Sequence, residues 1–395
     1  MKSRLFCALL LFVLMDFALR LSFRPALAEK LENSNHSAVW WALRDYQNNG
    51  NADIVMLGSS LMQQVVDDGE ATYLKRDIDP SQYHRCQHLE DLLTALVGAP
   101  VKTFSFALAG EFASDAAMLA KIMPAFGHPS RIIYGIAPRD FMDNSLSCPA
   151  STEVFRLVSR LDPERGLALE RRAYASQWDY WTKLFQARLE NISSLYGRRL
   201  EIAYAWKNRC DALALSVLQF FPDRSADLLT PRDRASIPED IRPGQKVIHP
   251  EWGTPVFFDN RAQYICSYQP FRPRSYGTQL SYFKDLLQCC AENSIAVTVV
   301  NMPITKDNME LMQAGFYKLY LDDVSRAALN ASAEFVDLNQ SGLFEKADFK
   351  DTVHLNGYGA QKFVKLLAAR LSNSTVNQLA SAVRARQVAE SRQFH

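Results

Sequence analysis

The stretch IVMLGSSLM (residues 54–62) decides the fold, because a short apolar run ends in three small residues before a helical pattern begins. A run of strand length that is apolar at every position is typical of a strand buried on both faces of a parallel sheet. The turn after such a strand lies at the carboxyl edge of the sheet, where α/β proteins bind ligands. Ser60 is therefore the first candidate for a functional residue.

Four more runs of strand length follow: Lys102–Leu108, Arg131–Ile136, Ile295–Val300 and Ala333–Leu338. Segments with helical spacing of apolar residues lie around them, namely His88–Val97, Ser114–Met123, 275–293, Met309–Leu329 and Gly357–Leu371. Strands that alternate with helices predict βαβ units and a sheet covered on both faces. We therefore predict an α/β fold, a three-layer α/β/α flavodoxin-like open parallel sheet of about five strands.

The strand–helix pattern is interrupted between residues 146 and 274. The first part of this segment is rich in helix-forming residues, and the second part holds many prolines and has no clear periodicity. We predict a large insertion here, a helical hairpin followed by a long loop, between two parts of one domain at residues 45–145 and 275–372. Residues 373–395 are expected to be a C-terminal tail that forms a weak helix or a frayed end.

The N-terminal segment differs from the rest of the chain. Lys2 and Arg4 precede an apolar run from Leu5 to Met15, which is shorter than the roughly 20 residues of a spanning helix. Residues 1–28 are predicted to be a cleaved signal peptide or an uncleaved N-terminal membrane anchor, with a buried core helix as a third alternative. The first two predict an extracytoplasmic protein that is periplasmic, secreted or held at the membrane by this segment.

Charge and cysteine usage exclude several classes of function. The formal net charge of +1 provides no basic field, so no nucleic-acid partner is expected. Six cysteines follow the N-terminal segment without a CxxC spacing, and one or two disulfides plus buried free thiols are expected rather than a zinc site. The histidines show no metal-ligand spacing with nearby carboxylates either. We therefore expect no metal and no organic cofactor.

A second candidate motif lies near the end of the chain, where Asp351 precedes His354 by three residues. A serine hydroxyl becomes a good nucleophile when a neighbouring histidine takes its proton, and a carboxylate orients that histidine. Each motif alone has an ordinary structural explanation: the serines can cap a helix, and Asp351 can cap the helix that follows it. The two motifs together favour catalysis by Ser60, His354 and Asp351.

At these positions the chain resembles the SGNH/GDSL hydrolase superfamily over two blocks that together span about 200 residues. Residues 58–60 match the nucleophile turn of that family, with Ser59 in place of its usual Asp, and Asp351 and His354 match its late Asp-x-x-His. The resemblance implies that Ser60 is the nucleophile and His354 the base. It also implies that Gly110, after the second strand, supplies a backbone N–H to the oxyanion.

The third block of the family departs from its pattern here. Relatives carry Gly-x-Asn-Asp after the next strand, with the Asn side chain donating to the oxyanion, whereas this chain has Arg139 and Asp140 there and Asn144 slightly later. Arg139 could replace the missing donor, with Asn144 as a further candidate for oxyanion or substrate binding. Alternatively, Arg139 forms an ion pair with Asp140 or another carboxylate and shapes the loop.

Further details resemble bacterial envelope-associated members, the alginate O-acetyltransferase group and the D-alanyl-lipoteichoic-acid transfer proteins. They are the N-terminal segment, the Gly-Ser-Ser turn and the sequences PRDF (138–141) and VNMP (300–303). The resemblance implies an extracytoplasmic serine esterase or O-acyltransferase that acts on acyl groups of a polysaccharide. A secreted esterase or lipase for small esters is the first alternative, and a non-catalytic binding or assembly protein on the same scaffold is the second.

Overall fold

The computed structural model describes residues 10–18, 38–49, 52–161, 170–197, 210, 247–340 and 342–393. The chain divides into two compact units, one formed by Met1–His36 with Pro163–Pro243 and the other by Ser37–Asp162 with Gly244–His395. The second unit holds the sheet and every candidate site residue. The divisions fall inside the predicted insertion of residues 146–274, so both ends of that segment belong to the sheet unit.

The described residues form one open sheet of five parallel strands in the order β2-β1-β3-β4-β5. The strands are β1 (Ile54–Gly58), β2 (Thr103–Ser105), β3 (Arg131–Ile136), β4 (Ala296–Asn301) and β5 (Glu334–Asp337). The predicted α/β fold class is confirmed. The chain reverses its direction of travel across the sheet at β1, which makes the gap between β1 and β3 the point where ligands bind in folds of this topology.

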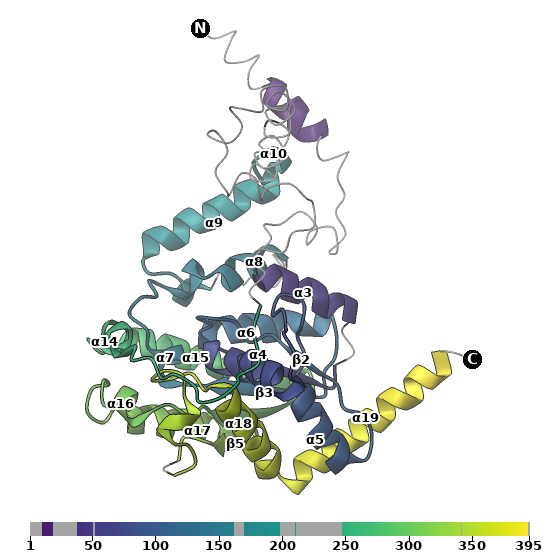
Figure 1. Ribbon diagram of the computed structural model, residues 1–395. Coiled ribbons are helices and arrows are strands. Elements are labelled where there is room, and N and C mark those ends of the chain that lie inside the picture. The colour runs from purple at the N-terminus through teal and green to yellow at the C-terminus, as the bar shows by residue number, and fades with distance from the viewer. Residues whose placement is uncertain are drawn as a thin grey trace, which may run out of the picture. The chain divides into compact units, whose positions relative to one another are not determined.

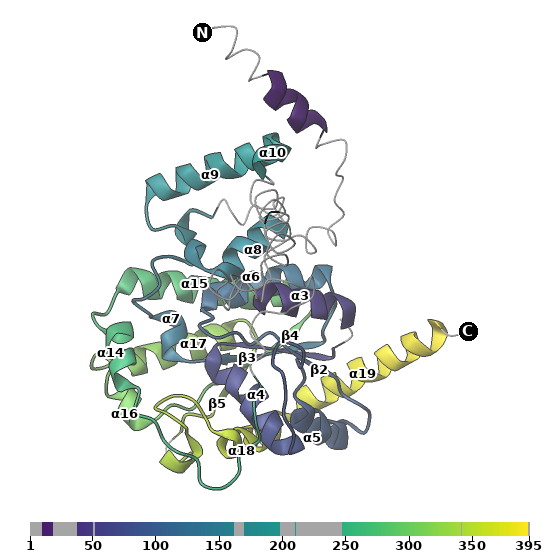
Figure 2. The ribbon, with the colours of Figure 1, turned by 45° about the horizontal axis from the view of Figure 1, so that its top comes forward.

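Helices cover both faces of the sheet (Figure 2). One layer contains α4 (Ser60–Leu74), α5 (Gln87–Val97) and α18 (Gly357–Arg370), and the other contains α6 (Ala113–Ile122), α15 (Pro273–Glu292) and α17 (Phe316–Asn330). Because both faces are covered, β1 and β3 are buried at every position, as their uninterrupted apolar runs predict.

Shorter helices complete the two units. The sheet unit also contains α3 (Ala38–Asn49), α7 (Pro138–Phe141), α8 (Glu153–Leu161), α14 (Arg261–Tyr268), α16 (Lys306–Met309), α19 (Asn373–Gln393) and the 3-10 turns η1 (Met123–Ala125), η2 (Pro149–Ser151) and η5 (Lys346–Asp348). The other unit contains η4 (Arg171–Ala173), α9 (Gln177–Ile192), α10 (Ser194–Gly197) and helical residues 10–18. Amphipathic α8 packs on α6 and buries Phe155 and Val158, which explains why the sheet unit extends past residue 146.

One predicted helical segment differs from the structure, and the C-terminal tail forms a helix, the first of its two predicted alternatives, rather than a frayed end. The segment Met309–Leu329 is not one helix, because α16 ends at Met309 and α17 begins only after Gly315, whose φ of 81° interrupts helical geometry. The C-terminal tail is the regular helix α19 over 21 residues, and Leu379 and Val383 on it are buried. This helix contacts α5 and is therefore part of the folded unit (Figure 1).

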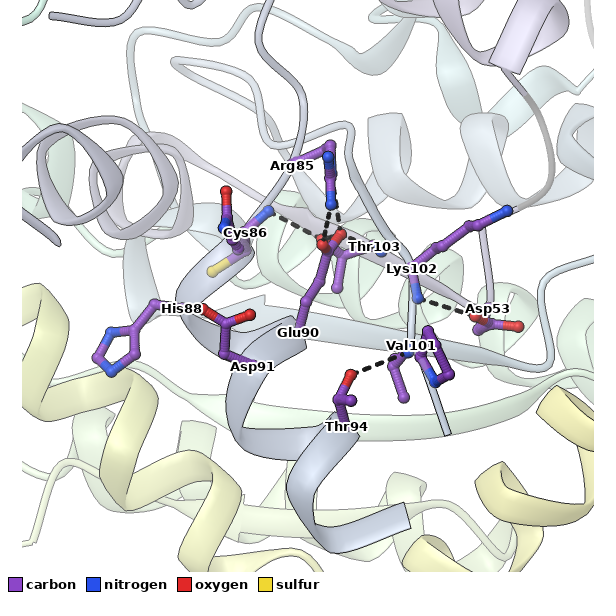
Figure 3. A network of polar contacts seen from close by, with 12 residues as sticks. Asp53, Arg85, Cys86, His88, Glu90, Asp91, Thr94, Val101, Lys102 and Thr103 are labelled. Atoms are coloured by element: carbon purple, nitrogen blue, oxygen red, sulfur yellow. Dashed lines mark hydrogen bonds and ion pairs between the residues drawn. The ribbon is translucent and has the colours of Figure 1, made fainter. Parts of the chain in front are cut away.

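A buried carboxylate fixes the short edge strand β2 to α5 (Figure 3). Glu90 accepts hydrogen bonds from the amide of Thr103 at 2.7 Å and from its hydroxyl at 2.9 Å. Arg85 pairs with the same carboxylate, and the Cys86 amide donates to the Thr103 hydroxyl at 2.8 Å. These contacts hold the strand that leads into the predicted oxyanion loop.

The described part of the N-terminal segment is the helix at residues 10–18, and the remainder of the predicted 1–28 segment lies outside the described residues. Among the helices that the structure describes, none has the length and hydropathy needed to cross a membrane.

The six cysteines of the described residues are all free thiols, which contradicts the expectation of one or two disulfides. Cys86 and Cys290 are buried within the sheet unit, and desolvation raises the pKa of the Cys290 thiol to about 12. Their burial makes them apolar packing groups.

Candidate active site

The turn after β1 places Ser60 at the first position of α4. Gly58 has a φ of 145°, a conformation that favours glycine, and a Cβ atom there would lie 2.7 Å from the carbonyl oxygen of Gly135 on β3. Ser59 makes no side-chain cap for the helix, so the first turn of α4 keeps free amide groups. The Ser60 hydroxyl therefore lies at the positive end of a helix dipole, at the carboxyl edge of the sheet.

Ser60, His354 and Asp351 form a continuous chain of hydrogen bonds. The Oγ atom of Ser60 lies 2.8 Å from Nε2 of His354, although 294 residues separate the two in sequence. Nδ1 of His354 lies 2.7 Å from Oδ2 of Asp351. Because a carboxylate accepts hydrogen bonds, it selects the tautomer with the proton on Nδ1, and the Nε2 lone pair then faces the serine hydroxyl. This is the geometry of a serine activated by a histidine base.

The carboxylate of Asp351 is held ionised by its surroundings. Burial alone would raise its pKa, but hydrogen bonds from the His354 ring and from the amides of His354 and Val353 outweigh burial and leave the pKa below its ordinary value. One carboxylate oxygen receives both amide hydrogen bonds, and the other receives the ring. Asp351 therefore keeps a fixed negative charge beside the histidine.

A small hairpin, residues 349–355, carries both residues and is called here the Asp–His hairpin. Phe349 and Leu355 pair across it as an isolated antiparallel bridge, and the Lys350 amide donates to the His354 carbonyl at 2.9 Å. Both Phe349 and Leu355 are buried, so the base of the hairpin is anchored in the core while the His354 side chain stays 17% exposed. Asn356 then caps α18 by accepting a hydrogen bond from the Gly359 amide.

The turn at Gly110 lies against the end of β1. The Leu108 amide donates to the Gly58 carbonyl at 2.9 Å, and the Glu111 amide donates to the Leu108 carbonyl at 3.0 Å. Gly110 has a φ of 77°, so glycine is needed for its backbone conformation, whereas a Cβ atom there would meet open space. Within the described residues the Gly110 amide donates to no backbone or side-chain acceptor. This N–H and that of Ser60 are thus available to an anion.

Arg139 forms an ion pair, one of the two alternatives that its sequence position leaves open. Its Nε atom donates to Oδ2 of Asp143 at 2.7 Å, and the partner is therefore a carboxylate other than Asp140. The guanidinium carbon lies 6.0 Å from the ring centre of Phe112, which follows the Gly110 turn. Asn144 donates its side-chain amide to the Pro270 carbonyl at 2.9 Å, and so this donor holds two loops together.

Three buried carboxyl groups lie behind the turn at Ser60, and of these the sequence pattern indicates only Asp140, as a possible partner of Arg139. They are Glu111, Asp115 and Asp140, which are 3% exposed or less and close enough to influence one another electrostatically. Desolvation raises the pKa of Asp115 to about 7 although Thr152 and the Phe112 amide donate to it. No capping signature in the sequence could have found them, because the N-cap residues three positions before Asp115 and Asp140 are Phe112 and Ala137, whose side chains cannot cap a helix.

Desolvation also raises the pKa of Asp140 to about 7. Hydrogen bonds from the Ser59 side chain and from the Ala137 amide lower it only in part. The carboxyl group of Asp140 therefore joins Ser59, the residue before Ser60, to the first turn after β3. The pKa of Glu111 is raised well above its ordinary value by burial and by the two neighbouring carboxyl groups.

No group of three or more His, Cys, Asp or Glu side chains in the described part of the chain has the arrangement of a metal site. No protein-family model matches this chain, and no curated protein matches its sequence. The assignment of a function therefore depends on the chemistry of the residues around Ser60.

Proposed function

We propose that this protein is an SGNH-type serine esterase or O-acyltransferase that works through an acyl-Ser60 intermediate. One observation carries the proposal, the hydrogen-bonded chain Ser60–His354–Asp351 at 2.8 Å and 2.7 Å. A hydroxyl, an imidazole and a carboxylate in this order are the groups that acyl transfer to a serine requires. Their position at the carboxyl edge of the sheet, where α/β folds bind ligands, agrees with this role.

In the first half of the reaction, Ser60 Oγ attacks the carbonyl carbon of an ester while His354 Nε2 takes the hydroxyl proton. The carbonyl oxygen becomes negatively charged, and the N–H groups of Ser60 and Gly110 donate to it. The C–O bond to the alcohol then breaks, and the departing oxygen receives the proton from His354. Asp351 stays ionised throughout and stabilises the imidazolium that forms in between.

In the second half, the hydroxyl of an acceptor attacks the carbonyl carbon of acyl-Ser60. His354 removes the acceptor proton and returns it to Ser60 Oγ as the bond to the serine breaks. If the acceptor is water, the reaction is hydrolysis; if it is a sugar hydroxyl, the reaction is acyl transfer. The Ser60 proton leaves with the alcohol in the first half and is replaced by the proton of the acceptor in the second, so the cycle balances and needs no external oxidant or reductant.

The proposed substrate is an acyl group, foremost acetyl, on a polysaccharide of the cell envelope or a secreted polysaccharide. Two features support it: the apolar run near the N-terminus, which favours export, and the resemblance of residues 58–60 and 138–141 to envelope-associated relatives. The same chemistry on a small secreted ester is the alternative. Membrane association through the N-terminal segment belongs to the same proposal.

Labelling with a fluorophosphonate probe tests the proposal, because such probes react with serines activated by a histidine base. We expect the intact protein to be labelled at Ser60, as located by peptide mass spectrometry. Ser60→Ala should abolish labelling, and Asp351→Asn should slow it by about 10³–10⁴-fold. The matched control is Ser381→Ala, at an exposed serine of α19 on the outer part of the sheet unit, which should be labelled at the rate of the unsubstituted protein.

Equal labelling of folded Ser60→Ala would show that the nucleophile is elsewhere, and a folded protein that no such probe labels would contradict acyl-serine chemistry. Incubation with an acetyl donor and oligosaccharides then separates the two acceptors. Acetylated sugar detected by mass spectrometry supports transfer, whereas free acetate alone supports hydrolysis.

A further inference from the structure

Thr352 lies at the tip of the Asp–His hairpin, between the two residues that it carries, and is fully buried. Its carbonyl oxygen accepts hydrogen bonds from the amide and the hydroxyl of Thr305 at 3.1 Å and 2.8 Å. Its hydroxyl accepts a hydrogen bond from the side-chain amide of Asn308 at 3.2 Å. The tip is therefore held from outside the hairpin by the segment around α16.

Asn260 holds the same residue from another direction. Its side-chain oxygen accepts hydrogen bonds from the Thr352 amide at 3.1 Å and from the Thr352 hydroxyl. Asn260 is itself buried, with 9% exposure, and lies in the last part of the predicted 146–274 insertion, which belongs to the sheet unit. With these bonds, every polar backbone and side-chain atom of Thr352 has a partner in another segment.

The position of Asn260 in its own helix makes this use of its side chain unusual. Asn260 is the N-cap of α14, where an asparagine oxygen commonly accepts a hydrogen bond from the first turn of the helix. Here it makes no such cap, and the neighbouring Asp259 accepts the Arg261 amide at 3.1 Å instead. The oxygen of Asn260 is thus committed to Thr352 rather than to α14.

The other end of α14 contacts the same group of residues. The hydroxyl of Tyr268, the last residue of this helix, donates to the side-chain oxygen of Asn308 at 3.0 Å, and Tyr268 is almost completely buried. Since Asn308 donates to Thr352, both ends of α14 are connected to the hairpin tip, one directly and one through a single intermediate. Helix α14 therefore connects Asn260 and Asn308, the two asparagines that form hydrogen bonds with Thr352.

We propose that Asn260 is a positioning residue of the acyl-transfer site, which fixes Thr352 and thereby sets the separation and orientation of Asp351 and His354. The inference rests on the proposed function of Ser60, Asp351 and His354. Asp351 Oδ1 receives the amides of Val353 and His354, so a shift of the Thr352 backbone moves the carboxylate and the histidine relative to each other. A misplacement of about 1 Å in such a site can cost about 100-fold in rate.

Asn260→Ala and Asn260→Asp test this inference in the full-length protein. The alanine variant leaves the Thr352 amide and hydroxyl without their acceptor, and we expect fluorophosphonate labelling of Ser60 to slow by about 10- to 100-fold. The aspartate variant keeps an acceptor in place and should recover most of the rate. Its added negative charge stabilises imidazolium, so the acidic limb of its pH–rate profile should move to higher pH. Asn293→Ala, at the exposed end of α15 on the opposite edge of the sheet, is the matched control.

A second measurement does not depend on activity. The Nδ1 proton of a histidine hydrogen-bonded to a carboxylate gives a far-downfield proton NMR signal, which we expect in the unsubstituted protein and in Asn293→Ala. This signal should be weakened or shifted in Asn260→Ala and restored in Asn260→Asp. If Asn260→Ala does not fold, Thr352→Val and Thr352→Ser replace it: valine removes the hydroxyl, and serine retains it.

A folded Asn260→Ala protein that keeps both the labelling rate and the downfield signal would overturn the inference. Failure of the proposed function looks different, because a folded protein would then remain unlabelled while the downfield signal still responded to Asn260→Ala. A general loss of stability in Asn260→Ala, with an unchanged signal and an unchanged pH–rate profile in the remaining folded fraction, would show a merely structural role and would likewise contradict the inference.

Discussion

Single residues at the end of β1 determine where the candidate nucleophile lies. Gly58 adopts a φ of 145°, and its missing side chain lets β3 approach so closely that a Cβ atom would lie 2.7 Å from the Gly135 carbonyl oxygen. That obstacle is backbone, which cannot rotate away as the end of a side chain can. The direction in which the chain enters α4, and hence the position of Ser60, depends on this glycine.

Gly58→Ala should therefore destabilise the protein and displace Ser60. Backbone strain alone costs about 1–3 kcal/mol, and the contact with Gly135 adds to it. Urea unfolding followed by circular dichroism measures the change in the free energy of unfolding, and probe labelling reports the position of Ser60.

The control is Gly277→Ala, at an exposed position of α15 where a Cβ atom meets nothing within 4 Å. Because alanine is the better helix former, this change should increase the free energy of unfolding by about 0.5–1 kcal/mol. Equal effects of the two substitutions would contradict the role assigned to Gly58.

At the scale of elements, the edge strand β2 has only three residues and depends on contacts outside the sheet. Glu90 of α5 satisfies both the amide and the hydroxyl of Thr103 (Figure 3). The loop with Gly110 follows this strand directly, so the contact between α5 and β2 also supports the proposed oxyanion site.

Glu90→Ala should lower the free energy of unfolding by about 1–3 kcal/mol, because two buried donors lose their acceptor. The Arg85 side chain, which pairs with the same carboxylate, is 56% accessible. Arg85→Ala should therefore lower the free energy of unfolding by less than about 1 kcal/mol. Thermal or urea unfolding of both variants measures the two changes in the free energy of unfolding. If Arg85→Ala costs as much as Glu90→Ala, the ion pair rather than the bonds to Thr103 stabilises this edge.

The elements themselves were predictable to different degrees. Strands β1 and β3 were predictable because burial on both faces leaves an apolar signal along the whole strand, as in Ile54–Gly58, whereas the edge strand β5 is only partly buried and carries a weaker signal. The break at Gly315 was missed because it depends on a single backbone conformation, and the choice between a helix and a frayed end for the tail depends on its packing against α5. Ser60, Asp351 and His354 were recognisable because strand order and motif spacing locate them.

Other parts of the site could not be read from the sequence, because they depend on contacts between segments far apart in the chain. No local pattern indicates that the Asn144 side chain donates to the Pro270 carbonyl, 126 residues away, whereas Arg139 and Asp143 lie only four residues apart and their pairing was within reach of a local analysis. The bond from Thr352 to Asn260 joins positions 92 residues apart. Its existence follows only from the way α14 packs against the hairpin.

On the scale of the whole molecule, the sheet unit encloses two kinds of carboxyl groups whose contributions to stability change in opposite directions with pH. Asp115 and Asp140 have pKa values raised to about 7 by desolvation, from 3.8 in an unfolded chain. Such groups favour folding while protonated, so their contribution is complete below pH 3.8 and is lost as the pH rises through about 7. Asp351, whose pKa is lowered, contributes above its unfolded value and loses that contribution in acid.

We therefore expect the free energy of unfolding to decrease between about pH 4 and pH 7, the interval between the unfolded and folded pKa values, by up to about 1.4 kcal/mol for each unit of raised pKa. Urea unfolding across this range measures the slope. In the double variant Asp115→Asn and Asp140→Asn the slope should become flatter, because asparagine does not titrate. A slope that both substitutions leave unchanged would show that other groups carry the dependence.

The packing of α4 against α18 has a consequence for the biosynthesis of the protein. Two glycines allow this close approach: a Cβ atom at Gly69 would lie 2.9 Å from Ala360, and one at Gly357 would lie 2.1 Å from Thr72. Helix α4 begins at Ser60, and α18 begins three residues after His354. After a ribosome has incorporated Ser60, it must add almost 300 more residues before it incorporates His354. Under the proposed mechanism, the nascent chain carries an ordinary, unreactive hydroxyl until His354 has been added, and reactivity toward a serine probe reports that these two distant segments have joined.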